Sequence, residues 1–438
     1  MNTDSDKSDE TVDELPAFTT HEISREISVA LLTGGGDRPY AFGLATALIS
    51  KVPTLDLIGS DELDCPEFQN NPGVKFLNLR GNQRPDTSLA RKILRVSIYY
   101  AKLIRYASSS QPRIFHILWN NKFIFLDRTL LTLYYRLLGK KIAFTVHNVN
   151  AGRRDSRDTW LNRLTLRIQY RLVHHIFVHT KKMKLELIEE FGVKPTRVTV
   201  IPFGINNAVP NTRLTPSDAK KQLGIRHDKK TVLFFGNIAP YKGLEHLVAA
   251  FRLLLGHDEN YRLIIAGKPN NCERYWKSIH EDISENVAKG RVILRPEFIP
   301  DCETELYFKA ADVFVLPYRH IYQSGVLFLG YSFGLPVLAA DVGSLKDEIV
   351  EGSTGFAFRP EDPVALAVVI EQYFASDLYV DLNVRRRQIR EYATERHSWD
   401  VVAQTTMKVY ADLLRIPFPE KSANCELSNA SPDANASS

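Results

Sequence analysis

The sequence predicts an α/β protein made of two doubly wound parallel sheets that face each other across a cleft. The chain has 438 residues, which exceeds the usual range of about 100–200 residues per domain. Short runs rich in Val, Ile and Phe alternate with segments of helical period, a pattern typical of buried parallel strands joined by crossover helices. One stretch, residues 206–228, contains Pro210 and Pro216 and few strand formers, and it divides the runs into two series.

Each series supplies the strands of one sheet. The first comprises residues 27–32, 114–118, 142–146, 175–179 and 198–201. The second comprises residues 231–235, 261–266, 292–294, 313–316, 336–339 and 355–358. We therefore expect an N-terminal domain at 21–206, a linker at 207–228, a C-terminal domain at 229–398 and a final helix within 399–417. Residues 1–20, which are acidic, and 418–438 are rich in Ser, Asp and Asn, and we expect them to be disordered.

The composition is that of a soluble globular protein, with 44% hydrophobic and 24% charged residues. No run of about 18 apolar residues is present, so no membrane-spanning helix is expected. The four cysteines, Cys65, Cys272, Cys302 and Cys425, have neither metal-binding nor CxxC spacing, and the N-terminus has no secretory pattern. These features predict a cytoplasmic protein in a reducing compartment.

Two loops in the first series carry residues with possible chemistry. Gly34, Gly35 and Gly36 follow the first strand and precede a helix expected near Ala41, so the backbone can turn tightly and approach a ligand. The third glycine of a dinucleotide fingerprint is missing, and a structural turn is an equal alternative. His147 follows the third strand and is expected to point into the cleft as a proton carrier or hydroxyl ligand. It could instead satisfy loop carbonyls.

Two loops in the second series suit a diphosphate. Lys242 lies between Gly236, which ends a strand, and the start of the next helix, where free backbone N–H groups favour phosphate. A solvated lysine on a turn is the alternative. Ser324 and Gly325 begin another helix, and Arg319 adds a positive charge before it. Together these residues predict an anion site at the carboxyl ends of the second sheet.

Two helices of the first series are expected to carry basic stripes. The first stripe is formed by Arg91, Arg95, Lys102 and Arg105. Such a helix can lie on an anionic membrane surface, or it can be a core helix with a solvated face. The second stripe, formed by Arg163, Arg167 and Arg171, is read as a solvated face.

Other ligand classes find little support. No nucleic-acid motif or interleaving of basic and aromatic residues accompanies the basic stripes, so no nucleic acid is expected. The only D-x-D spacing, at Asp4 and Asp6, lies in the acidic tail, and no other metal-binding motif occurs. We therefore expect no metal site.

Several segments, in this order, resemble the retaining glycosyltransferases of family 4, which have the two-domain GT-B fold. The resemblance spans residues 25–416. The segments are Gly34-Gly35-Gly36, Thr145-Val146-His147, 200–206, Gly236 with Lys242-Gly243, 310–317, 334–337 and 352–355. Residues 235–244 and 323–327 look like the branch of the family that acts in bacterial polysaccharide and glycolipid assembly.

The resemblance implies two Rossmann-like domains, the first binding a glycan or lipid-linked acceptor and the second a nucleotide-diphosphate sugar. It implies transfer with retention of configuration, with no metal and no other cofactor. The final helix would cross back to the first domain. It assigns catalysis to His147 and Lys242, and an acceptor or diphosphate loop to Gly34, Gly35 and Gly36. The donor-binding residues it implies are Gly236, Asn237, Lys242, Arg319, Gln323, Ser324 and Gly325.

Departures from the family pattern leave other functions open. The family's two glutamates correspond to Ile321 and Leu329, and its usual arginine corresponds to Asn237. One alternative is a catalytically weakened member that binds a glycan or regulates an active partner. Another is an epimerase of sugar nucleotides with the same fold. A nicotinamide dehydrogenase is disfavoured by the missing glycine of the fingerprint.

Overall fold

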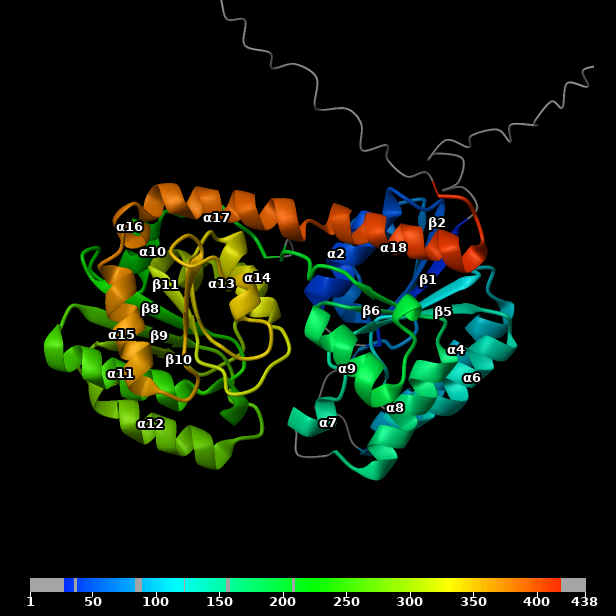
Figure 1. The fold of residues 1–438 in the computed structure, drawn as a ribbon, viewed down its shortest axis with the longest axis horizontal. Helices are drawn as coiled ribbons and strands as arrows, with labels where there is room; N and C mark the ends of the chain where they lie inside the picture. Colours follow the sequence, from blue (N-terminus) through cyan, green and yellow to red (C-terminus); the bar gives the residue numbers. More distant parts are fainter. Residues whose placement is uncertain are drawn as a thin grey trace, which may run out of the picture.

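The computed structural model describes residues 27–34, 38–82, 89–121, 123–154, 158–206 and 209–418. They form two parallel α/β units that lie side by side and are bridged by a long helical segment (Figure 1). This architecture confirms the predicted fold class. The predicted tails lie outside the described residues, apart from Phe418.

The N-terminal sheet has seven parallel strands in the order β3-β2-β1-β4-β5-β6-β7. Its strands are β1 (Ser28–Leu32), β2 (Thr54–Gly59), β3 (Val74–Asn78), β4 (Ile114–Ile117), β5 (Lys141–Val146), β6 (His175–Val178) and β7 (Val198–Val200). Its helices include α2 (Arg38–Ile49), α3 (Pro66–Gln69), α4 (Leu89–Ser109), α5 (Ile124–Leu126), the π-helical turn η3 (Asp127–Leu131), α6 (Thr132–Leu137), α7 (Ala151–Arg154), α8 (Trp160–Leu172) and α9 (Lys181–Phe191). Helix α2 covers one face of the sheet, and α4, α6, α8 and α9 cover the other.

The C-terminal sheet has six parallel strands in the order β10-β9-β8-β11-β12-β13. Its strands are β8 (Lys230–Phe235), β9 (Tyr261–Ala266), β10 (Val292–Arg295), β11 (Val313–Leu316), β12 (Val337–Ala340) and β13 (Gly355–Phe358). Its α-helices are α10 (Pro216–Gln222), α11 (Leu244–His257), α12 (Glu273–Ala288), α13 (Asp301–Ala310), α14 (Gly325–Ser332), α15 (Pro363–Phe374), α16 (Asp377–Val380) and α17 (Leu382–His397). In both sheets the strand order reverses beside the first strand, which is where open α/β sheets bind ligands.

All the predicted strands occur, with ends displaced by one residue at most, but the sequence pattern missed β2 and β3. Strand β2 carries an acid at its centre, Asp56, which is buried and accepts a hydrogen bond from the hydroxyl of Tyr106 at 2.7 Å. Strand β3 is at the edge of the sheet and only partly buried, so its apolar run is short.

The segment expected as a linker, residues 207–228, contains helix α10, which packs against α13. The ammonium of Lys220, on α10, lies 2.8 Å from the carboxylate of Asp312, and both side chains are buried. The same carboxylate accepts the backbone N–H of Thr231 at 2.8 Å. This contact attaches α10 to the C-terminal domain.

Two stretches of chain connect the domains: an outgoing one between β7 and α10, which includes Ile205, and a returning one from α17 to α18. After α17 the chain continues into α18 (Trp399–Leu414), which lies on the N-terminal domain against α2 (Figure 1). At the crossing, the indole N–H of Trp399 donates to the carbonyl of Ile205 at 2.8 Å, and Ile205 donates its N–H to His397 at 2.8 Å. The outgoing and returning stretches are therefore bonded to each other.

Candidate active site between the two domains

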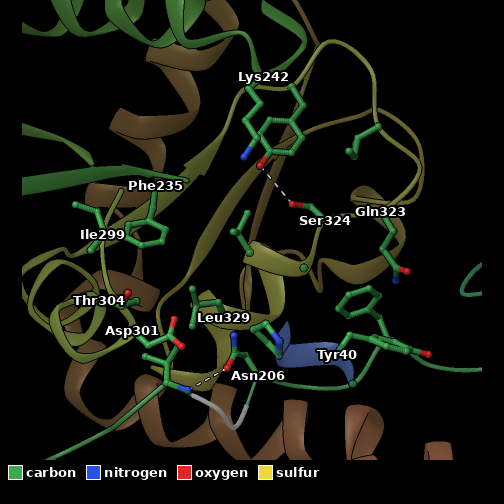
Figure 2. A pocket seen from close by; sticks show the side chains of 18 of the residues that line it. Tyr40, Asn206, Phe235, Lys242, Ile299, Asp301, Thr304, Gln323, Ser324 and Leu329 are labelled. Atoms are coloured by element: carbon green, nitrogen blue, oxygen red, sulfur yellow. Dashed lines mark hydrogen bonds between the residues drawn. The ribbon is translucent and has the colours of Figure 1, made fainter. Parts of the chain in front are cut away.

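A cavity of about 450 Å³ lies between the domains, beside the carboxyl end of β8 and the loop after β11. Its lining residues are Pro39, Tyr40, Phe203, Gly204, Asn206, Val209, Phe235, Tyr241, Lys242, Phe298, Ile299, Asp301, Thr304, Tyr318, Ile321, Gln323, Ser324, Gly325, Val326, Leu329 and Trp399. Figure 2 shows Lys242, Ser324 and Gln323 reaching the space from the C-terminal side, with Tyr40 on the N-terminal side. Most of the wall is apolar, so its few polar groups define what can bind.

Lys242 is a buried cation on this wall. It ends the short 3-10 helix η5 (Pro240–Lys242), and Gly243 follows with a φ of 65°. A Cβ atom at Gly243 would lie 2.0 Å from the carbonyl oxygen of Pro317, so only glycine lets the loops after β8 and β11 touch. The ammonium lies 5.2 Å from the ring centre of Tyr318. The fold thus holds one positive charge at the switch point of the sheet.

Ser324 and helix α14 add hydrogen-bond donors beside that charge. Ser324 is the N-cap residue, but its side chain does not cap the helix; its hydroxyl lies 3.3 Å from that of Tyr318. The first N–H groups of a helix have no partner within the helix, and they favour anions. Gly325 and Val326, which carry such groups, both line the cavity. Lys242 and Ser324 therefore flank the same tyrosine, which places a positive charge and a helix N-terminus next to each other on the cavity wall.

Gln323 brings in a residue that the sequence analysis missed, Glu348. The amide of Gln323 donates to one oxygen of Glu348 at 3.1 Å, and the other oxygen lies 3.4 Å from Nε2 of His397. Burial raises the pKa of Glu348 to about 7, and burial lowers the pKa of His397 to about 4. Glu348 ends the short 3-10 helix η6 (Lys346–Glu348) that follows β12, within a polar run that has no distinctive spacing, so only the folded structure relates it to Gln323.

Three predicted donor-binding residues do not line the cavity. The guanidinium of Arg319 forms ion pairs with Glu245 and, at 3.5 Å, with Glu361, and its Nε donates to His246 at 3.2 Å. Asn237 is exposed to solvent. Gly236 turns the chain after β8 with a φ of 104°, but it is not among the lining residues. The structure thus places Lys242, Gln323, Ser324 and Gly325 together and leaves these three outside.

The positions that correspond to the family's glutamates do face the cavity, as apolar side chains. Ile321 and Leu329 both line it. Of the lining residues, all of which the structure describes, Asp301 alone has a carboxylate, and it forms an ion pair with Arg38 of α2 at 2.7 Å. This pair links the two domains beside the cavity.

His147 lies one layer behind the cavity, not on its surface as predicted from its strand. Its ring is stacked on Trp119 at 4.1 Å between ring centres and meets the ring of Tyr40 edge-on at 4.7 Å. Its Nδ1 lies 3.2 Å from Nε2 of His179. Burial, followed by the nearby His179, lowers the pKa of His147 well below its usual value, so the ring is neutral at pH 7. Tyr40 separates it from the cavity, which a strand-end position cannot reveal.

The predicted glycine loop is only partly described. Gly34 has a φ of 57°, and a Cβ there would lie 2.0 Å from the carbonyl oxygen of Trp119. This close approach at the β1–β4 switch point explains why glycine is needed. Gly35 and Gly36 lie outside the described residues.

The described residues contain neither a metal-binding cluster nor a membrane-spanning helix. Within the described ranges, no three His, Cys, Asp or Glu side chains come together as a metal-binding group. In the same part of the chain, no helix has the length and apolarity needed to cross a bilayer.

Comparison with known proteins gives two family matches in sequence order. Residues 34–209 match the model of glycosyltransferase family 4, and residues 217–396 match the model of glycosyl transferases group 1. Similar curated proteins include the D-inositol 3-phosphate glycosyltransferases of Acidothermus cellulolyticus and Corynebacterium aurimucosum. The first is 30% identical over 52% of this chain and 51% of the relative, and the second 26% identical over 56% and 58%. The match thus spans little more than half of these relatives.

Solved structures share the fold. HepE of Anabaena, in complex with UDP and glucose, has a TM-score of 0.68 at 17% identity, over 88% of this chain and 100% of that one. Sucrose-phosphate synthase of Thermosynechococcus elongatus has a TM-score of 0.69 at 18% identity, over 89% and 99%. At this identity the likeness concerns the arrangement of the two domains.

Proposed function

Because the chain belongs to family 4 of the glycosyltransferases, we propose that it moves a sugar from a nucleotide-diphosphate sugar to a polysaccharide or lipid-linked acceptor. In this proposal the transferred unit is a hexose, the anomeric configuration is retained, and no metal takes part. The observation that carries the proposal is the anion site formed by Lys242 with the N-terminus of α14, on the wall of the interdomain cavity.

Lys242 takes the central role. When the bond between sugar and diphosphate breaks, negative charge grows on the departing phosphate, and a preorganised cation stabilises that charge. A buried ammonium is suited to this because few water molecules compete for it. The free N–H groups at Gly325 and Val326 would bind the same phosphates. A fixed cation and a helix terminus thus supply the charge neutralisation that a metal supplies elsewhere.

Other residues receive supporting roles. We assign Gln323, held by Glu348, to a hydroxyl of the sugar or ribose. His147 is assigned a positioning role that acts through Tyr40, whose ring it contacts. Gly34 and its neighbours remain the acceptor-side loop of the proposal. Arg319, with its ion-pair partners, would shape the loop after β11 instead of touching the donor.

We test this proposal by measuring the turnover of Lys242→Met in EDTA with a panel of UDP-, GDP- and ADP-sugars. UDP-glucose is the first donor to be tested because HepE was solved with UDP and glucose. Inositol 3-phosphate is included among the acceptors because the curated relatives are named for it. Turnover should fall by about 10²–10³-fold, the usual effect of losing one such donor. The exposed Lys277→Met is the matched control. Unchanged turnover would remove Lys242 from the mechanism, and dependence on an added metal would refute metal-free transfer.

A second candidate function follows from the apolar side chains of Ile321 and Leu329 on the cavity wall. Without hydrogen-bonding groups there, the protein could bind a glycan or regulate an active partner instead of catalysing transfer. The panel separates the two functions. A thermal shift with one nucleotide class supports the transferase. Glycan binding by a protein that neither binds nor turns over any nucleotide sugar supports the second.

A further inference from the structure

The outer face of the N-terminal domain is formed by α4, residues 123–138 and α8, which pack side by side on one face of the sheet (Figure 1). Helix α4 meets the second segment where Tyr100 stacks on Phe123, with ring centres 5.5 Å apart. That segment meets α8 where the guanidinium of Arg128 donates to the side chain of Asn162 at 2.8 Å. Since all three pack inward on the same core, their outward sides form one continuous surface.

This surface exposes an unusual number of large apolar side chains. Leu137 is 77% exposed, Trp160 75%, Leu130 64% and Leu94 61%. The other exposed members are Ile93, Ile98, Ile104, Phe123, Ile124, Phe125, Leu133, Leu138, Leu161 and Leu164. We call these fourteen residues the apolar outer face. Soluble monomers rarely expose contiguous apolar patches of this kind, which mark contact with a partner or a membrane.

Beside the apolar outer face lies a basic hollow of about 300 Å³, between the end of β3 and α4. Its lining residues are Asn78, Leu79, Arg80, Gly81, Arg91, Leu94, Arg95, Ile98 and Lys102. Four of these are cationic, and two, Leu94 and Ile98, also belong to the apolar outer face. The hollow therefore offers positive charge at a place where an apolar surface begins.

The region around the basic hollow carries a net positive charge, which favours a negatively charged ligand. Between residues 70 and 126 the sequence has ten lysines and arginines and one acid, Asp86. Among the described residues, Arg91, Arg95 and Lys102 form no ion pair; Arg95 donates to the carbonyl of Asn82. Uncompensated guanidinium groups bind phosphate well. An anion that also presents an apolar chain matches the basic hollow and the apolar outer face together.

We propose that the basic hollow binds the phosphate of an anionic phospholipid while the apolar outer face enters the bilayer around it. Basic side chains beside an exposed apolar face are the pattern of proteins that lie on anionic membranes. A second copy of the chain is a poorer occupant, because a symmetric contact would bring the same positive charges together.

The proposal places the membrane near the acceptor side of the cleft. The hollow follows β3, and Tyr40 of the cavity wall follows β1, two strands away in the sheet. Parallel strands end at the same edge, and two strand spacings are about 10 Å. A lipid-linked acceptor bound at this surface would have its headgroup on the cleft side. This lipid-binding proposal rests on the proposed function. Because lipid binding is measured without a sugar donor, a failure of lipid binding and a failure of sugar transfer can be distinguished.

Sedimentation of the full chain with lipid vesicles tests the proposal. We expect binding to vesicles of phosphatidylcholine with phosphatidylglycerol, and weak binding to phosphatidylcholine alone. The variant R91Q/R95Q/K102Q should lower the partition constant by about 100-fold, because each of the three basic residues contributes about fivefold. The variant L130D/L137D should lower it by about tenfold or more, because charged side chains resist entry into the bilayer.

The control is V364D/V380D, which places the same charges at exposed positions of the C-terminal domain and should bind as the unchanged protein does. Thermal unfolding establishes that each variant is folded. Equal binding to both vesicle types, or full binding by L130D/L137D, would overturn the proposal. Displacement from vesicles by millimolar glycerol 3-phosphate would show a soluble phosphate as the ligand. If the unchanged protein does not bind vesicles but forms a dimer, and the variant L130D/L137D is monomeric, the apolar outer face binds a second copy of the chain instead of a membrane.

Discussion

Replacing Glu348 by Gln tests the interpretation of the partly buried acid that holds Gln323. Glu348 has 18% of its side chain exposed, and burial raises its pKa to about 7. In the unfolded chain the pKa is near 4.5. Between these values the folded protein holds a proton that the unfolded chain has released, so stability falls as the pH rises from 4.5 to 7. The difference corresponds to about 3 kcal/mol at pH 8, taking about 1.4 kcal/mol for each tenfold change.

Glu348→Gln cannot ionise, and its carbonyl can still accept the amide of Gln323. The variant should therefore match the wild type at pH 4.5 and exceed it in free energy of unfolding by about 3 kcal/mol at pH 8. The other groups around the site, His397, Asp347 and Arg396, are the same in both proteins, so their titration largely cancels in the difference. Urea unfolding at the two pH values measures it.

The exposed Glu371→Gln serves as the control, since its side chain is 43% exposed and lies beside His257. It measures what the same substitution does to the free energy of unfolding at a largely exposed site. The reasoning is refuted if Glu348→Gln shows the same difference at both pH values, or if the variant is less stable at pH 8. The first result would mean that Glu348 ionises in the folded protein as easily as in the unfolded chain, and the second that His397 or Arg396 stabilises its carboxylate.

Two further predictions concern the C-terminal core and the wall behind the cavity. Lys220→Met should lower the free energy of unfolding by about 3–5 kcal/mol because it leaves the buried Asp312 without its cation; urea unfolding checks this, and Lys220→Met/Asp312→Asn should recover much of the loss. His147→Ala should lower turnover about tenfold by loosening Tyr40, whereas His147→Phe should keep most of it. A large loss with the phenylalanine variant would move the role from ring packing to the ring nitrogens.

The architecture could be predicted because buried parallel strands have a strong local signature. Runs such as β11 and β12 are apolar on both faces, so their position is visible without tertiary information. Strand β2 was missed because a pairing partner for Asp56, Tyr106, is 50 residues away. The same limitation applies to helix α10, whose attachment depends on a carboxylate 92 residues further along.

The cavity residues could be predicted where backbone geometry determines their position. They were harder to predict where side-chain partners determine it. Lys242 and Ser324 follow strand ends, and glycine or helix-start signals mark their loops. Arg319 has the same signals, but Glu245 and Glu361 from other loops hold it away from the cavity. Glu348 reaches Gln323 from a loop without a motif. Such choices among partners depend on the assembled domain.

Helix α18 makes the N-terminal domain a discontinuous unit. Trp399 occupies the space beside Gly43 and Gly204, where a Cβ would collide with its ring at 2.0 and 2.3 Å. At the other end of the helix, the hydroxyl of Tyr410 lies 2.6 Å from Nδ1 of His116, in the middle of the first sheet. During synthesis, therefore, the domain begun first acquires its last core residues only after the whole C-terminal domain has been made. A fragment that ends before residue 399 would leave that first domain with an open core.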